Sequence, residues 1–95
     1  MKINQPFETT RTGFWMTFEN GYAMSVQWGT ANYCTNRSFD NPNTGIVGDA
    51  RVSNTAEVAI IEPNGSFHEF EDGSMTKGWC TPEEVHDLMT YCRSL

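Results

Sequence analysis

The chain has 95 residues, of which 38% are hydrophobic and 13% aromatic, and its formal net charge is −6. A chain of this length is expected to form one domain, residues 1–95, with a small core built mainly from aromatic side chains. The acidic balance argues against nucleic-acid binding, which requires a basic face.

The first predicted element is a hairpin in the stretch FWMTFENGYAMSVQWG, residues 14–29. A two-residue turn at Asn20-Gly21 would mix apolar and polar side chains on both faces of the hairpin. A three-residue turn, Glu19-Asn20-Gly21, separates them, because a one-residue shift moves every side chain to the other face. The predicted cross-strand pairs are Phe18 with Tyr22, Met16 with Met24, and Phe14 with Val26.

The opposite face of this hairpin is predicted to be small and polar apart from Trp15. Such a face of an antiparallel sheet is typically solvated or covered by a loop. Its predicted residues are Trp15, Thr17, Ala23, Ser25 and Gln27.

Residues 30–54 form a long polar segment, in which a short strand around 45–52 is conceivable. Binding residues often lie on loops carried by a rigid scaffold, so this segment is the expected site. Aromatic, amide and guanidinium groups together suit a planar ligand that carries a phosphate or carboxylate. The alternative is a covering loop, with Tyr33 and Phe39 at the edge of the core and Arg37 paired with an acid. The candidate contact residues are Trp28, Asn32, Tyr33, Asn36, Arg37 and Arg51.

A second hairpin is predicted in AEVAIIEPNGSFHEF, residues 56–70. Pro63 suits the first corner of a type I turn, and Gly65 suits the left-handed position after it. The register pairs Glu62 with Ser66, Ile60 with His68 and Val58 with Phe70, and it places Ile61 and Phe67 on the opposite face. The run VAII is apolar on both faces, which indicates a central strand covered on both sides.

The C-terminal segment TPEEVHDLMTYCR predicts a helix. Thr81 suits the N-cap, Pro82 the first helical position, and Glu84 completes a capping box. The apolar stripe of Val85, Leu88, Met89 and Cys92 has helical spacing and should face the sheet. Trp79 and Leu95 are expected to pack at the two ends of the helix. The predicted fold is therefore α+β: an antiparallel sheet of two hairpins, about four strands in the order ββ-loop-ββα, with one helix on one face.

Three cysteines, Cys34, Cys80 and Cys92, leave one thiol over after any single disulfide. The chain has no C-x-x-C pair, and neither His68 nor His86 lies at zinc-ligand spacing from a cysteine. We expect reduced thiols and neither a metal nor a cofactor. A nucleophilic Cys34 would need one of the two histidines as its base, and the sequence holds no catalytic signature to support this. A protein without enzymatic activity is expected.

The strings MTFENGYAMSVQWGTANYCTNR, AEVAIIEPNGSFHEF and GWCTPEEVHDLM resemble small uncharacterised proteins encoded by bacteriophages and prophages. This resemblance implies an accessory protein that acts inside an infected or lysogenic cell.

No apolar run is long enough to span a bilayer, and the first residues lack the apolar segment of a secretory signal. The expected location is therefore the host cytoplasm, without membrane contact. The favoured function is the binding of a host protein partner. The alternative is the binding or sequestering of a small molecule, such as a nucleotide signal, by the 30–54 loop. A homo-oligomer, such as a symmetric dimer, is a further expectation for so small a domain.

Overall fold

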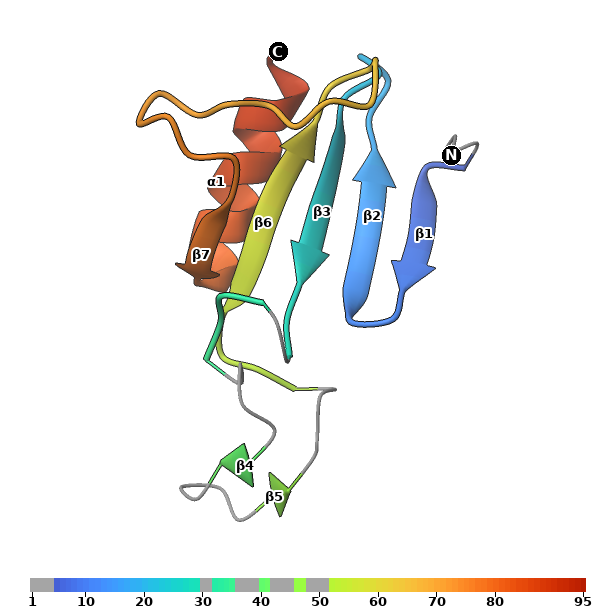
Figure 1. The fold of residues 1–95 in the computed structure, drawn as a ribbon. Coiled ribbons are helices and arrows are strands. Elements are labelled where there is room, and N and C mark those ends of the chain that lie inside the picture. Colours follow the sequence, from blue (N-terminus) through green and yellow to red (C-terminus); the bar gives the residue numbers. More distant parts are fainter. Residues whose placement is uncertain (1–4, 30–31, 36–39, 42–45, 48–51) are drawn as a thin grey trace.

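The computed structural model describes residues 5–29, 32–35, 40–41, 46–47 and 52–95. Its main sheet has five strands in the order β1-β2-β3-β6-β7, and each neighbouring pair is antiparallel (Figure 1). The strands are β1 Phe7–Thr10, β2 Gly13–Thr17, β3 Ala23–Gln27, β6 Ala56–Ile61 and β7 Lys77–Cys80, followed by helix α1, Pro82–Arg93. A separate two-stranded sheet joins β4, Asp40–Asn41, to β5, Ile46–Val47, which lies within the range predicted for a short strand.

The predicted register of the first hairpin is confirmed. Phe14 pairs with Val26 and Met16 with Met24, and Phe18 N donates to Tyr22 O at 2.9 Å. Gly21 has a φ of 88°, the left-handed conformation that the three-residue turn requires. Because Asn20 Nδ2 also donates to the carbonyl of Cys92 at 2.9 Å, the turn is attached to the end of the helix.

The second hairpin is only partly as predicted. Its turn forms, with Glu62 N donating to Ser66 O and His68 N to Ile60 O, both at 2.8 Å, and Gly65 at a φ of 91°. The return strand shrinks to a single bridge between Ile61 and Phe67.

The predicted pairing of Val58 with Phe70 is wrong, because Val58 pairs with Lys77 of β7. Phe70 instead turns into the core, where it is buried, and a tight turn from Phe70 to Ser74 reverses the chain. The later segment 77–80 therefore occupies the place beside β6. With β1, which the sequence analysis did not predict, the sheet has five strands rather than four.

The helix follows the prediction closely. Thr81 caps it, and the capping box is complete: Glu84 N donates to Thr81 Oγ1 at 3.2 Å, and Thr81 N donates to Glu84 Oε1 at 2.9 Å. The predicted stripe packs on the core, with Cys92 fully buried. Trp79 and Leu95 do not pack at the helix ends as expected, because both are exposed. Among the described residues, no helix is both long and apolar enough to cross a membrane.

The helix covers only part of the sheet. Strands lie about 4.8 Å apart, so five of them span roughly 19 Å, whereas a helix with its side chains is about 10–12 Å wide. Among the described elements, α1 packs on β3, β6 and β7, and Figure 1 shows it away from β1 and β2. We call the side that α1 occupies the helix face and the other side the open face. β6 is buried on both faces, as predicted.

Candidate functional site

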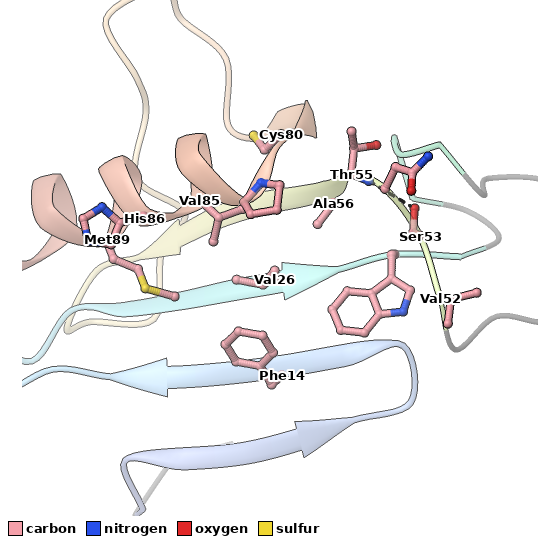
Figure 2. Close-up of a pocket in the computed structure, with 13 residues that line it drawn as sticks. Phe14, Val26, Val52, Ser53, Thr55, Ala56, Cys80, Val85, His86 and Met89 are labelled. Carbon is pink, nitrogen blue, oxygen red and sulfur yellow. Dashed lines mark hydrogen bonds between the residues drawn. The ribbon is translucent and has the colours of Figure 1, made fainter.

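An apolar pocket lies on the helix face, between α1 and the strands β2 and β3. Its volume is about 460 Å³. Figure 2 shows Phe14 and Val26 on the strands opposite Val85 and Met89 on the helix. The remaining lining residues include Trp28, the segment 52–56, Cys80, Pro82 and His86.

The sequence builds this pocket from well-defined local elements. The capping box fixes the first turn of the helix, so Val85 and Met89, one turn apart, face the sheet. The hairpin register places Phe14 directly across from Val26. Trp28 follows β3 at its end, and its carbonyl accepts a hydrogen bond from Asn32 Nδ2 at 3.1 Å.

Next to the pocket lies an apolar surface on β1 and β2 that no helix of the described residues covers. Phe14 lines the pocket, and Met16, two residues further along β2, lies on the same face and pairs with Phe7 of β1. The Phe7 side chain is 71% exposed, although it lies on the helix face of the sheet. We call Phe7, Phe14 and Met16 the open shelf, because α1 does not extend over β1 and β2. The open shelf is part of the helix face and lies on the opposite side of the sheet from the open face.

The structure divides the predicted contact residues into separate places. Trp28 lines the pocket, whereas Tyr33 lies against the exposed Trp79 of β7, with ring centroids 5.5 Å apart. Asn32 holds the backbone of Trp28. Four of the residues named in the sequence analysis lie outside the described residues: Asn36, Arg37, Phe39 and Arg51. The structure therefore does not test whether the predicted amide and guanidinium groups form one binding site.

The Tyr33–Trp79 pair could not be predicted from the spacing of these residues. Trp79 N donates to Tyr33 O at 2.7 Å, and Trp79 has a φ of 51°, which is unusual for a residue with a bulky side chain. Tyr33 N donates in turn to Glu57 Oε1 of β6 at 3.2 Å. Tyr33 is thereby fixed beside β6 and β7, whereas Thr35 N donates at 2.8 Å to the hydroxyl of Thr55, which lines the pocket.

The three thiols are buried rather than presented to a substrate. Cys34 is 1% exposed, and its Sγ accepts a hydrogen bond from Gly29 N at 3.2 Å. Burial raises the pKa of the Cys92 thiol to about 11. Burial, with a smaller effect of Glu84, also raises the pKa of the Cys80 thiol. Neither Cys80 nor Cys92 is therefore an activated nucleophile, which requires a lowered pKa.

A polar cluster that the sequence analysis missed joins the second hairpin to the helix. His68 Nε2 lies 2.8 Å from Tyr91 Oη, and Nδ1 lies 3.4 Å from Glu62 Oε2. The rings of Tyr22 and Phe70 pack edge-on against the imidazole, so this histidine is held within an aromatic cluster. Within the described part of the chain, no group of three or more His, Cys, Asp or Glu residues is arranged to hold a metal ion.

Comparisons with known proteins returned no match among protein-family models, curated proteins or solved structures.

Proposed function

We propose that this protein acts without catalysis, by binding a protein partner whose apolar element covers the open shelf. The observation that carries this proposal is the exposure of Phe7 on a face of the sheet that elsewhere forms the core. The uncovered width of the sheet, roughly 7–9 Å, approaches the width, about 10–12 Å, of one more helix with its side chains. An amphipathic helix of the partner would complete the helix layer and could insert one side chain into the neighbouring pocket.

The resemblance to phage and prophage proteins supplies the cellular context of the proposal. The partner would be a protein of the bacterial host, and binding would take place in the host cytoplasm. The acidic net charge of −6 favours a partner with a basic rim around its apolar element.

Two exposed phenylalanines on opposite faces of the sheet allow a matched test. Phe7 lies on the helix face, whereas Phe67, 52% exposed, pairs with Ile61, whose side chain lies on the open face. Tagged wild-type protein, Phe7→Asp and Phe67→Asp would each be used to capture partners from a bacterial host lysate. We expect Phe7→Asp to reduce recovery of the specific partner about tenfold or more, because a few apolar anchors buried at the centre of an interface supply most of the binding free energy. Equal recovery by the two variants would contradict the proposal.

Small-molecule binding is the second candidate, and the pocket itself favours it. A volume of about 460 Å³ and a mainly apolar lining with a few polar groups are typical of ligand sites. Ser53, Thr55 and His86 supply the polar groups. None of the described lining residues is Lys or Arg, so the pocket would take the base of a nucleotide rather than its phosphates. Arg51 immediately precedes the lining residue Val52 in the sequence.

Thermal unfolding with a panel of cyclic and linear nucleotides tests this second candidate. A ligand present at a hundred times its Kd should stabilise the protein by about 2.7 kcal/mol. Met89→Glu, which places a charge in the pocket, should abolish the shift, whereas Phe7→Asp should leave it intact. The absence of a shift with any nucleotide would count against this candidate and leave the protein-partner proposal untouched.

A further inference from the structure

A second hollow lies on the open face, away from the helix and from the surface proposed above. Its volume is about 490 Å³. It is bounded by Trp15 and Glu8 on one side and by the turn of the second hairpin, at Pro63, on the other. We call it the turn-side groove. One end is closed where the two hairpin turns meet, because a Cβ atom built on Gly21 would lie 3.2 Å from Pro63 Cγ.

The groove arises because the middle of the open face carries small side chains. The small residues that line the groove are Thr17 and Ala23, which pair across β2 and β3, and Gly21 in the turn between these strands. The large ring of Trp15 packs against the buried cluster of Ala23, Ala59 and Ile61. Because these small residues lie beside the large ring of Trp15, a groove remains between them that no described side chain fills.

The charge of the groove is negative. Glu8 lies directly across from Trp15 in the β1–β2 register, so the two side chains share a face. Glu62 also lines the groove, but its Oε2 is near His68 Nδ1. Glu8 is half-buried, and its carboxylate forms no hydrogen bond or ion pair with a side chain or loop among the described residues. No described lining residue is Lys, Arg or His.

We propose that the turn-side groove binds a guanidinium group on an apolar stem. A planar guanidinium can stack on the ring of Trp15 and at the same time form paired hydrogen bonds to the Glu8 carboxylate. Such a cation would neutralise an unpaired, half-buried acid in a protein whose net charge is −6. The chemistry fits an arginine side chain of a peptide or the same group on a free small molecule. This inference does not depend on the proposed function, because it concerns the other face of the sheet.

N-acetyl-argininamide is the probe for the first measurement, and N-acetyl-citrullinamide is its uncharged counterpart of the same shape. Binding would be followed through the indole N–H resonance of Trp15, identified by its loss in Trp15→Phe. We expect the arginine compound to shift this resonance in a saturable manner and the citrulline compound to leave it unmoved. Equal shifts with both compounds, or no shift with either, would overturn the proposal.

Glu8→Gln and Glu71→Gln separate the groove from the overall acidity of the protein. Both remove one negative charge, but the exposed Glu71 does not line the groove. We expect Glu8→Gln to weaken binding of the probe about tenfold, the usual effect of losing a charged hydrogen bond. Glu71→Gln should change it less than twofold. The same loss in both variants would mean that the cation binds only non-specifically, and would overturn the proposal.

The source of the cation is tested with two further ligands. An acetylated Ala-Arg-Ala amide should bind more tightly than N-acetyl-argininamide if the natural ligand is a peptide, and no more tightly if it is a free compound. Spermidine tests the choice of guanidinium over ammonium. Stronger binding of spermidine than of either arginine ligand would overturn that choice. Thermal unfolding of Glu8→Gln confirms that the variant is folded before its binding is compared.

Discussion

Thr17 carries a buried hydroxyl for which the described residues provide no hydrogen-bond partner. It lies on β2 opposite Ala23, among the small residues of the open face. By contrast, the hydroxyl of Thr12, in the turn between β1 and β2, donates to Gln27 Oε1 at 2.7 Å. The two threonines therefore differ in whether their polar atom is satisfied.

Thr17→Val should raise the free energy of unfolding by about 1 kcal/mol, because it removes a buried hydroxyl that has no partner. Thr12→Val should lower it by about 1 kcal/mol, because it removes a hydrogen bond that is made. Urea unfolding monitored by circular dichroism measures both. A loss of stability in Thr17→Val equal to that of Thr12→Val would show that the Thr17 hydroxyl is satisfied in solution.

The buried thiol of Cys92 should make stability depend on alkaline pH. Its pKa in the folded state, about 11, lies above the ordinary value of 9.0, so the folded protein retains this proton longer than the unfolded chain. Its contribution to stability is complete below pH 9 and is lost as the pH rises toward 11. The urea midpoint should therefore fall over this range, and it should fall less in Cys92→Ala than in the wild type. Parallel curves for the two proteins would contradict the assignment.

At the scale of elements, the helix and the first hairpin were predictable, and the second hairpin only in part. The capping box and the turn at Gly21 are local patterns whose geometry is set by a few neighbouring residues. The return strand was not predictable, because the competition for the edge of β6 between residues 66–70 and 77–80 is decided by tertiary packing. Phe70 is buried in the core, and the free energy of burying this ring outweighs the strand hydrogen bonds that are lost. β1 was missed because FETT is short and largely polar.

The candidate site also depends on tertiary packing that the sequence pattern does not reveal. Trp28 was identified because it follows a predicted strand, and the structure places it in a pocket. The other side of that pocket is formed by the helix, and the polar residues of the long segment gave no indication of this contact. Tyr33 was grouped with Trp28 by closeness in sequence, but its backbone bonds to Glu57 and Trp79 carry it to another edge of the sheet.

The cap of the helix provides a test at this scale. Thr81→Ala removes the side chain that accepts from Glu84 N, and should lower the free energy of unfolding by about 1 kcal/mol. Thr90→Ala, at an exposed position within the same helix, should leave stability unchanged or raise it slightly, because alanine favours helix. Thermal unfolding of the two variants gives the comparison. A smaller effect at Thr81 than at Thr90 would mean that the cap does not hold the helix start.

At the scale of the whole molecule, helix α1 covers part of the five-stranded sheet, and within the described part of the chain Phe7 stays exposed beside the core. Exposed apolar patches of this kind mark interaction surfaces, and in the absence of a partner they promote self-association.

Light scattering over a range of concentrations should therefore show self-association of the wild-type protein. Phe7→Asp should shift the equilibrium toward the monomer, because it places a charge at the edge of the open shelf, whereas Phe67→Asp should behave as the wild type. A wild-type protein that stays monomeric at millimolar concentration would contradict self-association through the open shelf. The shelf would then be covered by a different protein and not by a second copy of this chain.

The contact between Tyr33 and Trp79 also affects how the sheet can grow. A sheet edge with free backbone donors is a template on which another chain can add a strand. At β7 the Trp79 N–H is already bonded to Tyr33 O, and the left-handed conformation at Trp79 falls within the register shift of the β6–β7 ladder, between the pairs Val58–Lys77 and Ala56–Cys80. This arrangement disfavours the addition of a strand at the outer edge of β7. Among the described strands, β1 forms the opposite edge of this sheet, and its outer side is where a strand of another chain can be added.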